Sequence, residues 1–300
     1  MLIGTNLAKV ADWSTQLPFI DAFKSSSKAI GRSEQAKKEW GSSQSDFDLK
    51  LDWYSKRTTE VMQIWDDVFG GDRERVKGVM GGIAANSWAS ERMLSYEWTD
   101  DPKSHSDYGI DALAIAPYFG YYLGEPNNVS QIEGWTRDSD GGLNKLFDEI
   151  TKGGVLNNSP SGGALQQSYG WMAEQVDLAK KEGLQLLAYE GGSHVAGING
   201  TENNQATTNL FIAANRDPRM GDIYKEYLRK WNELGGGLFM HFNDIGEPSK
   251  WGSWGLLENV AQNSSPRYDA VMDAINFGGC CDRIVFGLSF RSIKKMLVLN

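Results

Sequence analysis

The sequence predicts an α/β fold that resembles part of a (β/α)8 barrel. Helical stretches alternate with short apolar runs, a pattern typical of a parallel sheet. A glycine stop follows several of the helices, and the runs are almost wholly apolar, as strands buried on both faces should be. No G-x-G-x-x-G or phosphate-binding loop follows an early strand, which favours the barrel over a doubly wound sheet.

The repeated unit is a helix, a turn and a strand that ends in polar or aromatic residues. The predicted helices cover Leu51–Phe69, Ser90–Trp98, Tyr169–Lys181 and Asp222–Leu234. The strands that follow them cover Val76–Ala85, Ile110–Ala116, Leu184–Tyr189 and Leu238–Phe242. One further strand, Leu2–Leu7, opens the chain. About five of the eight βα units are therefore recognisable.

The missing strands set the expected domain organisation. Residues 1–276 are predicted to form one incomplete barrel domain, with the junction of a missing region near 25–48. Within the first fifty residues only a helix near Leu17–Lys24 and a Ser-rich stretch are expected. Residues 277–300 form an atypical tail, in which Ile284–Phe286 could pair as a stray strand. Five strands leave open edges, so self-association through these edges is expected, and failure to fold autonomously is a third possibility.

Composition excludes several classes of partner. The chain has 300 residues, 40% of them hydrophobic and 23% charged, so it can bury a core. A net charge of −9 argues against nucleic-acid binding. No apolar run reaches the roughly 20 residues of a membrane span, and the N-terminus lacks the features of a signal peptide. The two cysteines, Cys280 and Cys281, are adjacent, so the chain is no disulfide scaffold and its compartment stays open.

Several motifs carry a resemblance to a known family. They are Gly4-Thr5-Asn6-Leu7, Ala11-Asp12-Trp13-Ser14-Thr15-Gln16, Ala114-Ile115-Ala116-Pro117-Tyr118-Phe119-Gly120, Ala188-Tyr189-Glu190-Gly191-Gly192 and Pro248-Ser249-Lys250-Trp251-Gly252. Together they resemble a bacterial, often cyanobacterial, family of cellulose-binding-type proteins whose members are similar to clan-A glycoside hydrolases. The resemblance covers roughly residues 2–30 and 35–275. It implies a protein that acts on or binds β-linked polysaccharide, with a retaining mechanism in the parent family, and it is consistent with an extracellular location.

The chain departs from that family in one stretch. In the family, further strands separate the Trp-Ser-Thr-Gln segment from the helix that resembles Leu51–Phe69, and they carry an Asn-Glu acid/base pair. Here Ser25–Lys28 leads almost directly to Gln35–Lys38, and the single Asn-Glu pair, Asn232-Glu233, lies late in a predicted helix. A deletion, a gene-model error or a degraded gene would each produce this pattern. The resemblance therefore implies impaired hydrolysis for this chain.

Glu190 is the predicted nucleophile. Strand alternation places Leu186, Ala188 and Glu190 on one face, with the carboxylate at the mouth of the barrel. Retaining glycosidases need such a carboxylate about 5 Å from a second, protonated carboxyl. Glu125, Asp244 and Glu247 could replace the missing acid only if loops place them suitably. The structural alternative is a strand-end glutamate that forms a salt bridge or caps a loop.

The remaining strand ends predict a polar and aromatic rim for substrate. Tyr118 could donate a hydrogen bond that holds Glu190 ionised, or it could be an aromatic plug. Two asparagines could bind sugar hydroxyls or cap helices, and three tryptophans could stack on sugar rings or lie in the core. The predicted substrate-binding residues are Asn86, Trp88, Tyr118, His194, Asn243, Trp251 and Trp254.

Metal and cofactor chemistry are not expected. No His-x-His pair stands at a strand end, and His241 shares a face with Phe239 and Asn243, which favours an interior histidine. No lysine stands at the end of a predicted strand, so Schiff-base chemistry is not expected either. The function that competes with glycoside hydrolysis is non-catalytic binding of cellulose or a similar carbohydrate by the aromatic rim.

Overall fold

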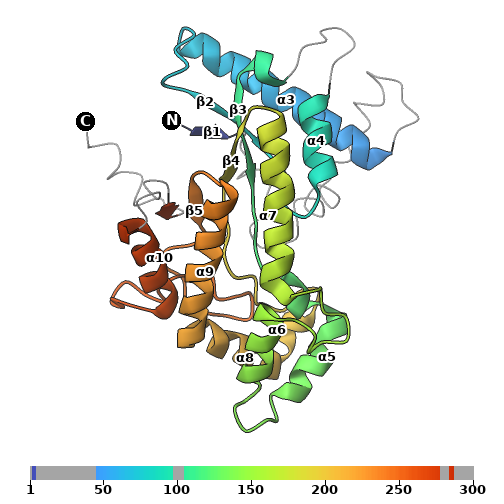
Figure 1. Ribbon diagram of the computed structural model, residues 1–300, viewed down its shortest axis with the longest axis vertical. Helices are drawn as coiled ribbons and strands as arrows, with labels where there is room; N and C mark the ends of the chain where they lie inside the picture. The colour runs from blue at the N-terminus through green and yellow to red at the C-terminus, as the bar shows by residue number, and fades with distance from the viewer. Residues whose placement is uncertain (1, 5–44, 97–104, 278–283, 287–300) are drawn as a thin grey trace. The chain divides into compact units, whose positions relative to one another are not determined.

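The computed structural model describes residues 2–4, 45–96, 105–277 and 284–286 (Figure 1). These residues form an α/β protein with eight α-helices and six strands, and every strand pairing that they show is parallel. The chain divides into two compact units. The first comprises Met1–Ile115 and Glu174–Leu187, and the second comprises Ala116–Ala173 and Ala188–Asn300.

Parallel strands and two complete helices make up most of the first unit. Strand β1 (Leu2–Gly4) pairs with β2 (Lys77–Gly81), which pairs with β3 (Ile110–Ile115). The helices are α3 (Asp46–Val68) and α4 (Ser87–Ser95), and a 3-10 turn, η2 (His105–Tyr108), precedes β3. Strands β2 and β3 are buried along almost their whole length, as their apolar sequences predict.

The second unit is mainly helical. Its complete helices are α5 (Pro126–Trp135), α6 (Leu143–Thr151), α8 (Gln205–Arg216), α9 (Pro218–Leu234) and α10 (Pro266–Phe277), with short 3-10 turns η3 (Tyr121–Gly124) and η4 (Thr201–Asn203). Helix α7 (Gly163–Lys181) and strand β4 (Gln185–Ala188) are each divided between the units. Ala188 of β4 pairs with Phe239 of β5 (Phe239–His241), and β5 pairs with β6 (Ile284–Phe286).

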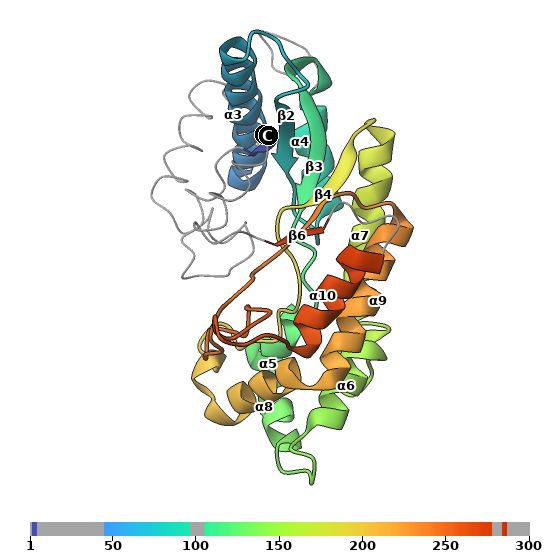
Figure 2. The same cartoon turned by 90° about the vertical axis from the view of Figure 1, so that its left-hand side faces the viewer.

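Helix α9 shows how the sequence builds the second unit. Pro218 occupies its first turn, the Asp217 carboxylate accepts from the Arg219 amide at 2.9 Å, and Gly235 ends the helix with a left-handed φ of 99°. Its buried face includes Trp231, Tyr224 and Tyr227, the three largest fully buried side chains among the described residues, at helical spacing. Helix α10 packs beside α9 (Figure 2).

The structure confirms the parallel α/β pattern and each of the four predicted helix–strand units, with ends shifted by a few residues. Helices α5, α6, α8 and α10 were not predicted, and α3 begins at Asp46 rather than Leu51. The tail contains β6, which adds a sixth strand to the expected five. The predicted helix at Leu17–Lys24, residues 5–7 of the first strand and both cysteines lie outside the described residues. No helix within the described ranges has the length and apolar character needed to cross a membrane.

Candidate functional site

The candidate site lies in the second unit, where three loops meet. These loops are residues 117–121, residues 190–194 after β4, and residues 242–257 after β5. Backbone hydrogen bonds join the first two, from the Phe119 amide to the Gly192 carbonyl at 3.1 Å and from the His194 amide to the Phe119 carbonyl at 2.8 Å. The Phe242 amide donates to the Gly191 carbonyl at 3.2 Å, which ties the third loop to the second. Tyr118, Glu190 and Trp254 are thus carried on mutually bonded segments.

Five rings from these loops form what we call the aromatic cluster: Tyr118, Tyr121, His194, Phe242 and Trp254. Three of them contact one another nearly at right angles. Ring centroids lie 5.8 Å apart for Tyr118 and His194, 5.8 Å for Tyr118 and Trp254, and 5.0 Å for His194 and Trp254. Tyr121 reaches His194 at 4.9 Å, and Phe242 reaches Trp254 at 6.1 Å. Such edge-to-face contacts are favourable and hold each ring in a defined orientation.

Glu190 is a partly buried carboxyl within this region. Burial raises its pKa from 4.5 to about 7, and no charged neighbour contributes to that shift. Within the described part of the chain, no hydrogen bond or ion pair reaches the carboxylate. At neutral pH the group is therefore divided between its protonated and ionised forms, so it can either donate or accept a hydrogen bond.

That Tyr118 holds Glu190 ionised stays a prediction, since no hydrogen bond joins the two groups within the described part of the chain. Burial, and after it the negative charge of Glu190, raises the pKa of the Tyr118 hydroxyl well above its usual value, so the two groups do interact. A donated hydrogen bond would lower the pKa of Glu190, whereas burial raises it. Loss of hydration outweighs any stabilisation of the charged form by Tyr118.

The two glycines after Glu190 explain why the loop can close under the aromatic cluster. A Cβ on Gly191 would lie 2.6 Å from the Phe239 ring. Gly192 has a φ of 137°, and a Cβ there would lie 2.9 Å from both the His241 Nε2 and the Tyr224 hydroxyl. Only glycine fits both positions without displacing the side chains below.

Tyr224 and His241 form the polar floor beneath this loop. The Tyr224 hydroxyl accepts from the Ser193 amide at 2.9 Å and lies 3.2 Å from the His241 Nε2. Burial, with a smaller effect from the charge of Arg267, lowers the pKa of His241 to about 3, so the ring is neutral. These contacts support the predicted interior role of His241. No group of three His, Cys, Asp or Glu side chains in the described ranges is arranged to hold a metal ion.

The two tryptophans of the third loop differ in exposure. Trp251 is 57% exposed, and the Lys250 Nζ lies 4.6 Å from the centroid of its ring. Trp254 is half-buried in the aromatic cluster, and its Nε1 donates to the Trp251 carbonyl at 2.9 Å. Trp251 is therefore largely exposed to solvent, while the ring of Trp254 is fixed by its neighbours.

Asn243 takes part in the candidate site through its backbone hydrogen bonds. Its amide donates to the Trp254 carbonyl, and its carbonyl accepts from the Leu256 amide, each at 3.0 Å. These bonds tie the end of β5 to the tryptophan loop. The Asn243 side-chain Oδ1 is buried and, among the described residues, has no hydrogen-bond partner.

Asn86 and Trp88 belong to the first unit. The Asn86 side chain caps α4 and accepts from the Ala89 amide at 3.0 Å, which is the capping alternative considered for it. Trp88 is 50% exposed, stacks on Phe47 at 6.3 Å and contacts the Arg92 guanidinium. Neither forms part of the aromatic cluster.

Sequence reasoning did not identify Tyr121, Phe242 or Tyr224 as parts of the site. Tyr121 and Phe242 adjoin the strand-end motifs, so a wider window around each strand end would have included them. Tyr224 lies in a helix, and its hydroxyl reaches the loop only through tertiary packing. The chain matches no protein-family model, no curated protein and no solved structure.

Proposed function

We propose that the chain binds β-linked glycan, of the cellulose type, through the aromatic cluster and Glu190, with little or no hydrolytic turnover. The observation that carries the proposal is the carboxyl of Glu190 beside Tyr118, on the loop that also carries His194 and is bonded to the loops of Tyr118 and Trp254. Aromatic rings offer apolar faces for the C–H surface of a pyranose, and a few polar groups fix its orientation. Trp251, with its exposed ring, would extend this surface along a polymeric ligand.

The chemistry of Glu190 supports binding more than turnover. A retaining mechanism needs a second carboxyl about 5 Å away, and loss of a general acid commonly costs about 10²- to 10⁴-fold in rate. Burial alone accounts for the raised pKa of Glu190, and no charge of Glu125, Asp244 or Glu247 adds to that shift. A carboxyl with a pKa of about 7 can instead exchange hydrogen bonds with sugar hydroxyls in either protonation state.

We further propose that the parallel strands are the remnant of a (β/α)8 barrel, as the family resemblance implies. A barrel that lacks strands has open edges, and self-association through them is part of the same proposal. Sedimentation velocity over a concentration series tests it, because a monomer at every concentration would contradict it.

The binding proposal is tested by isothermal titration of the full chain with cellohexaose, alongside pull-down on insoluble cellulose. We expect measurable binding that is lost in Trp251→Ala and Trp254→Ala. Val260→Ala is the matched control, because Val260 follows the third loop in the sequence and is 88% exposed. Absence of binding by the folded parent chain, or equal loss in the Val260 variant, would contradict the proposal.

Retained glycosidase activity is the second candidate. A pKa of about 7 suits Glu190 to the role of a general acid, whereas the predicted role of nucleophile needs the ionised form. Assay of aryl β-glycosides with the parent chain and Glu190→Gln separates the two. Robust turnover that this substitution abolishes would establish the enzyme, and binding without turnover would support the first proposal.

A further inference from the structure

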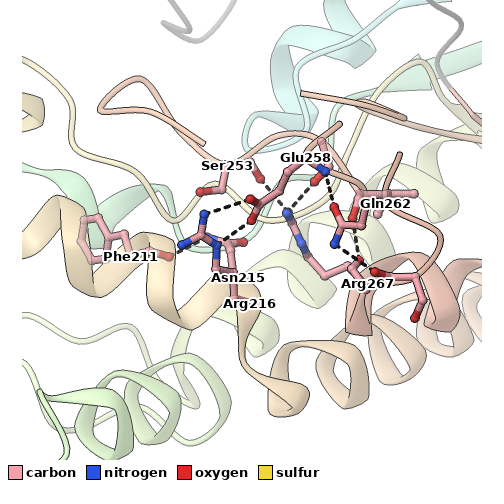
Figure 3. A network of polar contacts seen from close by, with 11 residues as sticks. Phe211, Asn215, Arg216, Ser253, Glu258, Gln262 and Arg267 are labelled. Atoms are coloured by element: carbon pink, nitrogen blue, oxygen red, sulfur yellow. Dashed lines mark hydrogen bonds and ion pairs between the residues drawn. The ribbon is translucent and has the colours of Figure 1, made fainter. Parts of the chain in front are cut away.

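The backbone around Trp254 is held at three successive carbonyl groups. Arg267, in the first turn of α10, donates from Nη1 to the Ser253 carbonyl at 2.6 Å and from Nη2 to the Gly255 carbonyl at 2.5 Å. The carbonyl of Trp254 itself accepts from the Asn243 amide at 3.0 Å. One guanidinium therefore holds the carbonyls on both sides of Trp254, and its bond to Ser253 can be followed in Figure 3.

Arg267 is an unusual residue to find at this position. It is 4% exposed, no carboxylate within the described ranges forms an ion pair with it, and its Nε has no hydrogen-bond partner there. Burial of a cation without a directly paired carboxylate is costly. Two charge-assisted bonds to carbonyls, and the longer-range attraction of Glu258, whose pKa Arg267 helps to lower, offset part of that cost. The planar fork of arginine presents donors from two nitrogens in a fixed geometry, whereas the ammonium of lysine is a single point on a flexible stem.

The fixed backbone also fixes the indole of Trp254. The Nε1 of the ring donates to the Trp251 carbonyl at 2.9 Å. Gly252 has a φ of 129°, and a Cβ there would lie 2.4 Å from the Trp254 ring, so the ring lies directly against this glycine. With backbone and ring both constrained, the indole meets Tyr118 and His194 in one orientation.

We propose that Arg267 is a positioning residue for the glycan site: by holding the carbonyls on both sides of Trp254, it sets the orientation of the indole in the aromatic cluster. The ligand in this statement rests on the proposed function, whereas the link between Arg267 and Trp254 does not. Arg216 supplies a matched comparison. It lies in the same polar network (Figure 3) and forms a bidentate pair with Glu258 at 2.6 and 2.9 Å, but its side chain is 59% exposed and bonds neither Ser253 nor Gly255.

The test is ¹⁹F NMR of the full chain labelled with 5-fluorotryptophan, in which Trp254→Phe identifies the Trp254 signal among those of the eleven tryptophans. In Arg267→Lys we expect that signal to shift or broaden, and affinity for cellohexaose to fall by roughly tenfold or more, as expected for a loosened site. In Arg216→Gln the Trp254 signal and the affinity for cellohexaose should both stay as in the parent chain. An unchanged Trp254 signal in the folded Arg267→Lys variant would overturn the proposal.

The positioning role of Arg267 can be separated from the proposed function and from a failure to fold. If the Trp254 signal responds as expected but the parent chain binds no cellohexaose, the positioning role stands and the proposed function fails. If Arg267→Lys does not fold, arginine side-chain NMR of the parent chain decides instead. Two carbonyl acceptors should give separate, slowly exchanging Hη signals for Arg267, and averaged, fast-exchanging signals would overturn the proposal.

Discussion

The carboxyl of Glu190 lies close enough to the hydroxyl of Tyr118 to raise its pKa, although no hydrogen bond joins the two groups within the described residues. Burial, and then the charge of Glu190, raises the pKa of Tyr118, while burial raises the pKa of Glu190 to about 7. Burial thus disfavours the charged form of both groups, and at pH 7 Glu190 is divided between its two forms. A largely aromatic surface of this kind, with little charge, suits an uncharged ligand better than an ionic one.

Glu190 should make stability depend on pH. Below the unfolded-state pKa, near 4.5, the group is protonated in both states and costs nothing. Between about pH 4.5 and 7 the unfolded chain ionises this carboxyl while the folded chain keeps its proton, so stability falls across that window and stays low above the folded pKa. We expect Glu190→Gln to be more stable than the parent chain by roughly 2–3 kcal/mol at pH 8, and equally stable at pH 4.5.

Urea unfolding of both proteins at several pH values measures this difference. A constant difference across the range would show that Glu190 does not titrate differently in the folded and unfolded states.

Gly192→Ala should destabilise the second unit. The substitution forces a side chain into a φ of 137° and toward the Tyr224 hydroxyl and the His241 ring at 2.9 Å. A loss of roughly 2 kcal/mol or more is expected in the free energy of unfolding. Gly134→Ala is the control, because Gly134 lies in α5 and no atom lies within 4 Å of an added Cβ. That change should be neutral or stabilising by up to about 1 kcal/mol, and equal losses in the two variants would contradict the packing described.

Glu149 is a buried carboxylate whose contacts organise the segment after α6. It accepts from the hydroxyls of Tyr122 and Ser159 at 2.7 and 2.6 Å, and from the amides of Val155 and Leu156 at 2.8 and 3.0 Å. In Glu149→Gln an amide nitrogen would face donors in place of an acceptor, at a cost of roughly 2–5 kcal/mol. Thermal or urea unfolding measures the loss.

The neighbouring Asp148 is the control for that experiment. It is exposed and pairs with Lys152 at 2.7 Å, so Asp148→Asn should change stability by no more than about 1 kcal/mol. A comparable loss in both variants would mean that the buried contacts of Glu149 add little.

The strand-end motifs predicted much of the candidate site. Tyr118, Glu190, His194 and Trp254 follow apolar strands in the sequence, and parallel strands bring such ends together. Helices α5 and α8 escaped prediction because their polar faces are rich in Asn, Gln and Thr, which blur helical periodicity. Burial of Glu190 and the position of Arg267 could not be predicted, because each depends on tertiary contacts from loops or helices distant in sequence. The raised pKa of Glu190 follows from that burial alone.

Carboxyl ¹³C NMR of glutamate-labelled protein tests the central claim most directly. Glu190→Gln identifies the Glu190 signal, which is followed against pH with and without cellohexaose. We expect the Glu190 signal to titrate with a midpoint near 7 in the free protein. When the glycan is bound, both the midpoint and the chemical shift of that signal should change. A Glu190 signal that titrates identically with saturating glycan, or that has an ordinary midpoint near 4.5 in the free protein, would contradict a buried carboxyl in the binding site.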